Sequence, residues 1–556
     1  MALGILSHSA LWDGFKIKGE VNCEKIDERT EGRVLRERSY VLCDGELSGV
    51  KVFLELVRKK GTDNAPAVLI PNTLGNREDE KLTETLLSFG YIVANVDIEG
   101  KFSGKEYYTV YPENLDFANF NGNKKELYSG FESEKKVCWF VWTKALYYVV
   151  KYLSALPFVN AIGGIASGEI ATSLWQLSSV SQELDCAVFV GNAGWQSYRG
   201  YDKFLDAEPN FSDEELAVVA DIEAQSYANH VKCPCLLLSA LGDEEFDVDR
   251  AYDTMARISE RLYKATLYSF KRKSASTSAV QGIKLFFSKF LKKEEVELAG
   301  EPKLSVGTAD GKLVAEITLP TKAPASVRFY YSTDDESPAK RYYETVVPEE
   351  IKEGAKYRAT VSLQKEVKRA IVFASVRYEN GYGVCSNVEA VNFENGGDGN
   401  IVRSGIIYAS RDSSRSIFFP KNEEFGASLI DFNENNAIKK LSGPMGVGGV
   451  YCKNGLLTFK THGKGGKIRD DAMLLFDAFG KEDAELKVSL IAIDGGTQTE
   501  YFDYVHISGS ASWQNFKLDV RGFKTVDGMP LKNLDRIDAI AFESDKEYIV
   551  NNILWV

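Results

Sequence analysis

The chain changes from one periodicity to another near residue 296, and this change limits the folds open to it. From residue 50 onward, short apolar runs such as "AVLI" at 67–70 alternate with helical patterns, in which Leu82, Leu86 and Phe89 recur at helical spacing. Strands that alternate with helices are typical of a parallel sheet covered by helices on both faces. The first half of the chain is therefore predicted to be α/β.

After residue 296 the helical signal disappears and short alternating strands replace it. Hairpin turns are predicted at Asp310–Gly311 and Asn380–Gly381, because these dipeptides favour the left-handed backbone of two-residue β-turns. About seven strands between 302 and 394 fit a small immunoglobulin-like or fibronectin-like sandwich. The Gly-rich stretch "FENGGDGN" at 393–400 predicts a linker between this sandwich and a further β-rich region.

A chain of 556 residues is too long for a single hydrophobic core. We predict a multi-domain protein with an α/β body in residues 1–298, including a cap near 195–230. Residues 299–396 form the predicted immunoglobulin-like sandwich, and residues 397–556 form a second all-β domain. The fold class is therefore an α/β body followed by two all-β domains.

The stretch "AIGGIASGEIATSLW" at 161–175 raises the main functional question. It predicts a buried strand, a sharp Gly-rich turn and a helix, the setting in which a Gly-x-Ser-x-Gly motif holds a nucleophilic serine. The middle of Gly164-Ile165-Ala166-Ser167-Gly168 is alanine, so Ala166 stands at the expected nucleophile position and cannot attack. A second register, anchored on "GEIA", places Ile165 there instead and is no more reactive.

The order of these elements resembles the α/β-hydrolase fold and, within it, the dienelactone-hydrolase and acetyl-xylan-esterase group. The segments that carry the resemblance are "GGIASGEIA" at the turn and "YANHVKCPCLLLSALGDEEFD" around the penultimate strand, and the similarity covers residues 35–293. It implies a nucleophile on the turn, a carboxylate after the penultimate strand, a histidine base after the last strand and N–H donors for an oxyanion.

The resemblance implies specific residues for these roles. It points to Asp243 as the acid, with Asp247 as the second choice, and Ser167 is the nearest hydroxyl to the nucleophile position. The segment after the last strand, "SFKRKSASTSAV", contains no histidine, and Asn72 and Thr73 replace the His-Gly pair that is common at the oxyanion turn. A serine without a neighbouring base is a weak nucleophile. A degenerate catalytic site is therefore expected.

Aromatic side chains are expected around the pocket, with Trp195, Tyr198 and Tyr201 in the cap and Tyr108 before it. Aromatic rings at the mouth of a pocket suit sugar rings or apolar ligands. The alternative interpretation is that these rings only seal the cap against the body.

The last 150 or so residues are similar to galactose-binding-like, carbohydrate-binding jelly-roll modules. The similarity rests on "SWQNFKLDVRGF" and the closing "AIAFESDKEYIVNNILWV". It implies contact with carbohydrate or an acylated glycan. A structural calcium ion is compatible with such a module and with the acidic pair Asp470-Asp471, and no other cofactor or metal is expected.

Charge and composition exclude several classes of partner. A formal charge of −13 and a pI near 5.2 disfavour nucleic acid, because phosphate binding needs clustered Lys and Arg. No apolar stretch reaches the roughly 20 residues that span a bilayer. The eight cysteines have no regular spacing and are expected to be buried and reduced. These features predict a cytoplasmic protein, or an extracellular one if a leader has been removed.

Three functions remain open from the sequence. The favoured one is a catalytically degenerate hydrolase, a pseudo-esterase, that acts in carbohydrate recognition. The second is an active carbohydrate acyl or acetyl esterase that uses Ser167 as its nucleophile. The third is a structural or partner-binding protein without a small ligand.

Overall fold

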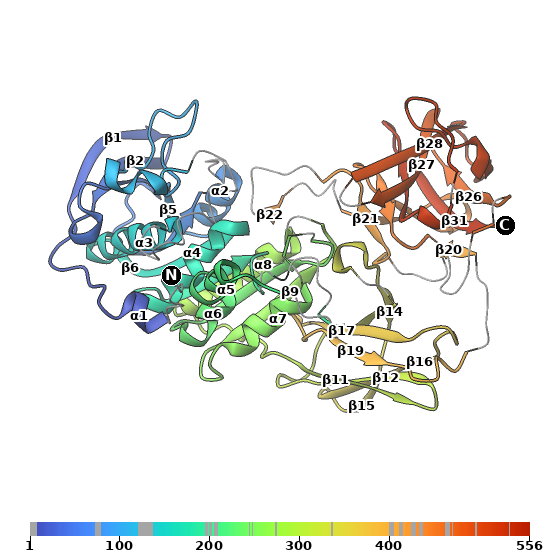
Figure 1. Ribbon diagram of the computed structural model, residues 1–556, viewed down its shortest axis with the longest axis horizontal. Coiled ribbons are helices and arrows are strands. Elements are labelled where there is room, and N and C mark those ends of the chain that lie inside the picture. The colour runs from blue at the N-terminus through green and yellow to red at the C-terminus, as the bar shows by residue number, and fades with distance from the viewer. Residues whose placement is uncertain are drawn as a thin grey trace.

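Figure 1 shows three lobes in the computed structural model: an α/β body at the left, a β-rich lobe at the lower right and another at the upper right. We call them the body (strands β1–β10), the middle lobe (β11–β19) and the C-terminal lobe (β20, β21 and β23–β31). The structure describes residues 8–72, 79–120, 137–194, 198, 203–204, 210–243, 245–246, 248–272, 275–334, 337–399, 405–410, 415–423, 430–432, 437–461, 468–469, 471–494, 497–532 and 534–556.

The body is built on one twisted sheet with the strand order β1-β2-β3-β5-β4-β6-β7-β8-β9. Strand β3 is antiparallel to both of its neighbours, and the strands from β5 to β9 run parallel to one another. This order, in which the chain reverses direction across the sheet once at β5-β4, forms the helix-covered, mostly parallel sheet that the sequence predicts. The strands are β1 (Cys23–Glu31), β2 (Val34–Leu42), β3 (Lys51–Lys59), β4 (Ala65–Pro71), β5 (Ile92–Val96), β6 (Val159–Ser167), β7 (Cys186–Val190), β8 (Cys235–Ala240), β9 (Lys264–Ser269) and β10 (Ala275–Ser276).

Helices cover both faces of the body sheet. Helices α2 and α8 contribute to one apolar core, and α3, α4, α6 and α7 contribute to the core on the other face. Every residue of β4 is buried, as expected for a strand between two helical layers. The helices are α1 (His8–Trp12), α2 (Glu80–Ser88), α3 (Cys138–Ala155), α4 (Ala171–Val180), α5 (Asp213–Asp221), α6 (Ala224–Tyr227), α7 (Val248–Arg257) and α8 (Ser278–Phe290).

The middle lobe continues the body sheet instead of standing apart from it. Cys385 of β18 pairs with Thr266 of β9, and residues of both lobes form one apolar core. The hairpin predicted at Asp310–Gly311 is confirmed, because both residues have positive φ and Ala309 pairs with Lys312. The strands are β11 (Lys303–Ala309), β12 (Lys312–Thr318), β13 (Ser326–Thr333), β14 (Glu344–Val346), β15 (Glu349–Lys352), β16 (Lys356–Val361), β17 (Arg369–Arg377), β18 (Gly383–Cys385) and β19 (Glu389–Asn392).

The Gly-rich stretch expected to be a linker is packed against the middle lobe as far as residue 399. The backbone N–H of Gly399 donates to the Leu363 carbonyl at 2.8 Å, and Asp398 accepts a hydrogen bond from Ser362 at 3.0 Å. A Cβ on Gly396 would lie 1.8 Å from the Lys365 carbonyl oxygen. The glycines therefore allow close backbone approach here, which is a different use from a free linker.

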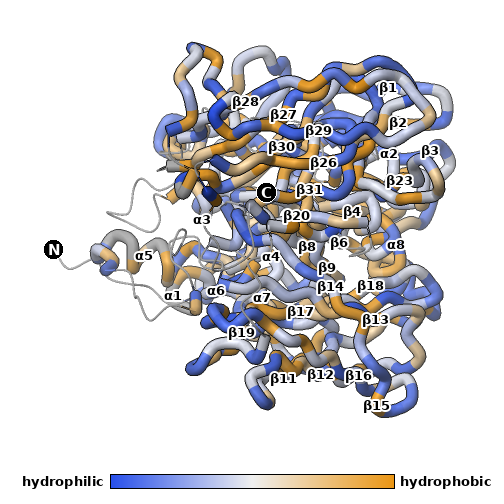
Figure 2. Tube along the Cα trace, turned by 90° about the vertical axis from the view of Figure 1, so that its right-hand side faces the viewer, coloured by the Kyte–Doolittle hydropathy of each residue, from blue (hydrophilic) through white to orange (hydrophobic). Residues whose placement is uncertain are grey.

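The C-terminal lobe consists of two packed sheets with a core of their own. One sheet has the order β23-β24-β31-β26-β29 with β20 beside β31, and the other has the order β21-β25-β30-β27-β28. Figure 2 shows hydrophobic and hydrophilic segments interleaved through all three lobes. The strands are β20 (Ile406–Tyr408), β21 (Phe418–Pro420), β23 (Lys439–Ser442), β24 (Gly448–Tyr451), β25 (Leu456–Thr458), β26 (Met473–Phe479), β27 (Ala484–Asp494), β28 (Thr497–Ile507), β29 (Gln514–Asp519), β30 (Ala539–Glu543) and β31 (Ile549–Trp555).

Two composition-based predictions can be compared with this fold. All eight cysteines are free and seven of them are buried, which confirms the prediction of reduced, buried thiols. No helix in the described part of the chain has the length and apolar character needed to cross a membrane.

A buried ion pair joins the lobes at their common junction. Arg341 of the middle lobe donates from both terminal nitrogens to the two carboxylate oxygens of Asp249 on α7, at 2.7 and 2.8 Å. Both side chains are essentially inaccessible to water. Two residues further on, the Tyr343 N–H donates to the carbonyl of Ser416 at 3.3 Å, which brings in the segment that precedes β21. All three lobes therefore meet within a few residues.

Replacing Arg341 by methionine should lower the thermal midpoint of unfolding strongly. The variant leaves the Asp249 carboxylate buried without its partner, a situation that costs about 3–5 kcal/mol. The double variant Asp249→Leu/Arg341→Met should lose less stability than Arg341→Met alone, because neither charge is then buried unpaired. Removal of the exposed Arg521, which pairs with Asp519, is the control and should change nothing measurable. Equal midpoints for Arg341→Met and wild type would contradict this account of the junction.

Candidate functional site

Ligands of open α/β sheets bind at the carboxyl ends of the strands, so the ends of β6, β7 and β8 form the first candidate site. Strand β6 ends at Ser167, which is extended with φ −132° and ψ 164°. The next residue, Gly168, has φ 53° and begins the turn into α4. Gly168 is therefore the left-handed residue of a sharp strand-to-helix turn, the kind of turn on which the sequence predicts a nucleophile.

This placement corrects the predicted position of the turn by two residues. Ala166 does not stand on the turn: it lies inside β6, pairs with Phe189 of β7 and is fully buried. Ile165 of the second register is also inside the strand. The misplacement arose from Gly164, which is needed for packing, since a Cβ there would lie 2.6 Å from Leu174 Cδ1 of α4.

The turn is held by a neighbouring asparagine and covered by an aromatic ring. Asn192, buried after β7, donates from Nδ2 to the Gly168 carbonyl at 2.8 Å and to Thr172 Oγ1 at 3.0 Å. A Cβ on Gly168 would lie 4.0 Å from the ring of Phe246, which is itself buried. The left-handed residue of the turn after β6 is thus a glycine that lies beneath a phenylalanine.

Ser167 lies next to the turn, but the described histidines are far from it. His230 stacks on His8 with ring centroids 4.0 Å apart, and His8 hydrogen-bonds Ser179 near the far end of α4. Ser179 is eight residues after the first residue of α4, about 12 Å along the helix at ~1.5 Å per residue. His506 is on β28 of the C-terminal lobe, and His462 lies outside the described residues.

The candidate acid, Asp243, follows β8 and stabilises its own loop. Its Oδ1 accepts hydrogen bonds from the backbone N–H groups of Glu245 at 2.8 Å and Phe246 at 3.2 Å. Its Oδ2 lies 3.9 Å from the position that a Cβ would take on Gly191, at the end of β7. Asp243 is thus beside the end of β7, and its bonds fix the loop that carries Phe246. The second-choice acid, Asp247, lies outside the described residues.

The other predicted pocket residues are only partly described. Asn72 is buried at the end of β4 and its N–H donates to the Val96 carbonyl at 2.8 Å, while Tyr108 is partly buried. Tyr198 packs edge-on against Phe211 and lies under the guanidinium of Arg250 at 4.6 Å. The predicted residues that lie outside the described part of the chain are Thr73, Trp195 and Tyr201.

The sequence reasoning missed a buried carboxylate on the same edge, Asp97, directly after β5. Burial raises the pKa of Asp97 to about 6, although the N–H groups of Thr109 and Gly100 donate to its Oδ2 and favour the charged form. These bonds tie the loop that follows β5 to residue 109. No motif singled out this residue, and its burial could not be predicted from the local pattern.

The segment after β9, where an α/β-hydrolase carries its histidine, instead anchors a later part of the chain. Lys271 is buried, donates to Asp431 at 2.7 Å and lies 3.8 Å from Glu423. The N–H of Arg272 donates to Glu423 Oε2 at 2.8 Å. Just beyond, β10 pairs in parallel with the short strand β22 (Ile430–Asp431).

The C-terminal lobe also contacts the end of the penultimate parallel strand. A Cβ on Gly242, directly after β8, would lie 3.0 Å from Cε1 of Phe419 on β21. The guanidinium of Arg272 lies 5.8 Å from the ring centroid of Phe459. The edge of the body sheet that would hold a catalytic acid and base is therefore a packing surface between lobes.

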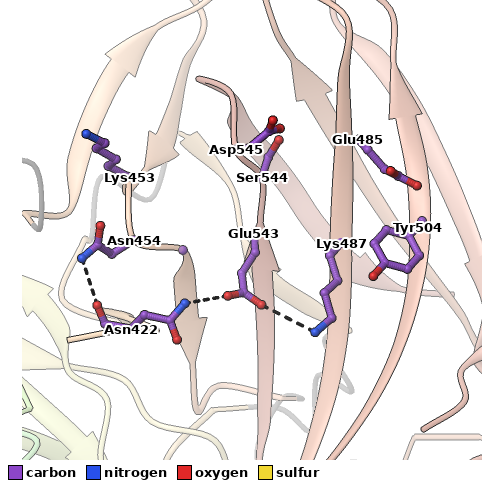
Figure 3. Close-up of a pocket in the computed structure, with 10 residues that line it drawn as sticks. Asn422, Lys453, Asn454, Glu485, Lys487, Tyr504, Glu543, Ser544 and Asp545 are labelled. Carbon is purple, nitrogen blue, oxygen red and sulfur yellow. Dashed lines mark hydrogen bonds and ion pairs between the residues drawn. The ribbon is translucent and has the colours of Figure 1, made fainter. Parts of the chain in front are cut away.

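A second candidate site is an open groove on the outer face of the β21-β25-β30-β27-β28 sheet (Figure 3). Its cavity volume is about 670 Å³. Polar and charged side chains dominate it, and Figure 3 shows them rising from neighbouring strands and turns. The lining residues are Asn422, Lys453, Asn454, Gly455, Glu485, Lys487, Tyr504, Glu543, Ser544 and Asp545.

The floor of the groove is a row of three residues on adjacent strands. Lys487 of β27 pairs with Glu543 of β30 on one side and with Tyr504 of β28 on the other. Leu486 and Val488 point into the core between the sheets, so the side chains of this row point outward. The row was not predicted, because alternation in "AELKVSLIAI" identifies a solvent-facing side but not a cavity.

A charged network fixes the side chains at one end of this row. Lys421 bridges Glu500 and Glu543, and Lys487 donates to Glu500 at 2.9 Å. Burial opposes ionisation of Glu500, but the hydrogen bonds from the two lysines outweigh it and lower its pKa to about 2. Asn422 donates to Glu543 Oε1 at 2.7 Å. The groove floor is thus held by ionised, mutually bonded groups.

No group of three or more His, Cys, Asp or Glu side chains among the described residues could hold a metal ion. Asp470 of the predicted calcium pair lies outside the described residues. Asp471 is bonded in both carboxylate oxygens to Arg469, at 2.9 and 2.7 Å. A calcium site remains a prediction.

Comparisons with known proteins give limited information on this chain. No family model and no curated protein matches its sequence. Solved structures similar to it include an acetyl xylan esterase from Paenibacillus sp. R4, at 12% identity and TM-score 0.39 over 51% of this chain and 92% of that one. Acetyl xylan esterase 1 from Thermoanaerobacterium sp. JW/SL YS485 has 11% identity and TM-score 0.33, over 45% and 81% of the two chains. Glucuronoyl esterase from Solibacter usitatus has 16% identity and TM-score 0.32, over 44% and 74%.

These TM-scores are low, so the assignment of the body rests on its own strand order. The N-terminal part of the chain is an α/β region with the arrangement of a hydrolase, and the remainder is β-rich.

Replacing Asn192 by leucine should destabilise the body without changing its sheet. The substitution removes the donor to the Gly168 carbonyl and to Thr172 and leaves these buried groups without that partner, at a cost of about 1–3 kcal/mol. Thermal unfolding checks this, with Asn454→Leu as a control, since Asn454 bonds an exposed turn of the C-terminal lobe. An Asn192→Leu midpoint equal to the control's would contradict a structural role for this residue.

Proposed function

We propose that this protein is a catalytically degenerate α/β-hydrolase that acts in carbohydrate recognition. The observation that carries the proposal is Gly168, the left-handed residue of the turn after β6, which has no side chain. A nucleophile on such a turn needs a hydroxyl or thiol and an adjacent base. The turn residue offers neither, and the described histidines lie at the far end of α4 (His8 and His230) and on β28 (His506).

The packing of the lobes supports the same proposal. The C-terminal lobe and the segment before it use the carboxyl edge of the body sheet as a contact surface, through Lys271, Gly242 and Arg272. An esterase must admit its ester to this edge and release two products from it. In this protein the C-terminal lobe covers the carboxyl edge of the body sheet. This arrangement suits a body that acts as a scaffold and positions a binding surface on another lobe.

The carbohydrate part of the proposal comes from the C-terminal lobe. The predicted likeness of this region to jelly-roll carbohydrate-binding modules and the polar groove on its outer face both favour a sugar ligand over a purely structural role. Sugars present many hydroxyl groups, and grooves that bind them combine aromatic faces with hydrogen-bonding side chains.

The second candidate function is an esterase that uses Ser167, and one observation favours it. Ser167 is partly buried directly beside the turn, and within the described part of the chain no hydrogen bond occupies its hydroxyl group. A rearranged turn and a base from outside the described residues, such as His462, would be needed. A structural role without any small ligand is the third candidate function.

Hydrolysis of aryl acetates and of acetylated xylan tests the proposal. Wild-type protein, Ser167→Ala and Gly168→Ser should all release acetate at the rate of the heat-denatured protein. Removal of triad residues in known hydrolases costs on the order of 10⁴- to 10⁶-fold in kcat, and Gly168→Ser restores a hydroxyl but not the base. Turnover by wild type that Ser167→Ala abolishes would replace this proposal with the esterase. A fluorophosphonate probe gives an independent readout, because it labels only activated serines.

A further inference from the structure

We propose that the groove around Tyr504 binds a neutral glycan chain, with the sugar rings stacked on Tyr504 and their hydroxyl groups bonded to Glu543 and Asn422. This inference rests on the proposed role in carbohydrate recognition and assigns it to one surface and one class of ligand. The size of the groove permits it, since about 670 Å³ lies within the range of ligand pockets, roughly 300–1,000 Å³.

Tyr504 supplies the apolar platform. Its exposed fraction is 49%, and the ring of Phe502, two residues earlier on β28, packs edge-on against it with the centroids 5.6 Å apart, which supports the ring and leaves about half of Tyr504 accessible. It lies in the same row as Lys487 and Glu543, at the edge strand β28. A sugar ring has an apolar face of C–H groups and a polar rim, which matches an aromatic ring set beside hydrogen-bonding groups.

The polar groups of the groove are fixed in place before any ligand arrives. Asn422 donates to Glu543 Oε1 at 2.7 Å, and Asn454 donates to the Asn422 carbonyl at 3.0 Å. Lys421 and Lys487 hold the other oxygen of Glu543. Because these side chains are already ordered, ligand binding does not have to offset the entropy that would be lost in ordering them. Hydroxyl groups that donate to an ionised carboxylate form stronger hydrogen bonds than those to neutral acceptors.

The charges of the groove favour a neutral ligand over an anionic one. Its lining contains three carboxylates, Glu485, Glu543 and Asp545, and two lysines. Lys487 already pairs with Glu500, so its charge is compensated within the protein. The formal charge of the whole chain is −13, and this net negative charge also repels an anionic ligand. A uronic-acid polymer would bring further carboxylates into this field, whereas a neutral glycan would not.

The groove is the accessible part of the outer face of the β21-β25-β30-β27-β28 sheet, and another part of this face lies against the body. Further along the same strands, Ile491 and Ala539 line a small cavity that Arg272 of the body also lines. The apolar part of the face therefore packs toward the body, and the polar part with Tyr504 stays accessible. The body therefore holds the C-terminal lobe by the apolar part of this face and leaves the polar part free to bind a ligand.

Affinity electrophoresis of the full-length protein tests the inference. The gels contain neutral polysaccharides (xylan, galactomannan, mixed-linkage β-glucan or galactan) or uronic-acid polymers (polygalacturonate or alginate). We expect retardation on at least one neutral polysaccharide and none on the uronic-acid polymers. Isothermal titration with the matching oligosaccharide should then show affinity weakened about tenfold or more in Tyr504→Ala, a loss typical of an aromatic residue at the centre of a binding surface.

The matched control is His506→Ala, on the same strand and the same face but outside the groove lining. Its affinity should equal that of wild type. Glu543→Gln, which keeps the size of the side chain and removes its charge, should also weaken binding. Because Tyr504 is exposed, Tyr504→Ala should unfold at the wild-type temperature, and thermal melts of each variant verify this.

Failure of the inference and failure of the proposed function give different results. Binding that survives both Tyr504→Ala and Glu543→Gln would overturn the assignment to this groove and leave the carbohydrate role intact. Binding to uronic-acid polymers alone would overturn the choice of a neutral ligand. Retardation on none of the polysaccharides would overturn the carbohydrate role, and this inference with it.

Discussion

The arrangement of the three lobes depends on the buried pair of Asp249 and Arg341. A guanidinium and a carboxylate that are both removed from water must be in contact, because separating them leaves an uncompensated charge in a medium of low polarity. Their contact fixes the middle lobe against α7. It also fixes Tyr343, to which the segment before β21 is bonded, so the C-terminal lobe is placed by the same junction.

This placement brings the C-terminal lobe onto the edge of the body where hydrolases perform their chemistry. Lys271 stands after the last strand of the parallel sheet and is neutralised by Asp431 and Glu423. The turn after β6 begins at Gly168 and is covered by Phe246. The carboxyl edge of the body sheet is thus an edge against which the lobes pack, and the groove at Tyr504 stays accessible.

The parts of this structure that follow local rules could be predicted from the sequence. The α/β alternation, the later change to strands and the turn at Asp310–Gly311 depend on short-range periodicity and on dipeptides that favour positive φ. The turn position was misjudged, because Gly164 looks like a motif glycine but serves helix packing. The linker at 393–400 stays a prediction, and its composition did not reveal that Gly396 and Gly399 permit close contact with residues 363–365. The ion pair of Asp249 and Arg341 joins positions 92 residues apart, and no local pattern reveals it.

Hydrogen–deuterium exchange of wild type and Lys271→Met tests the central claim most directly, that the carboxyl edge of the body is a docking surface. In wild type, peptides that cover 238–243 and 415–423 should exchange slowly, and in Lys271→Met both should exchange faster, because Glu423 and Asp431 lose their buried partner. Lys293→Met, which removes an exposed lysine, is the matched control and should leave these peptides unchanged. Fast exchange of the same peptides in wild type, or identical exchange in wild type and Lys271→Met, would contradict the account.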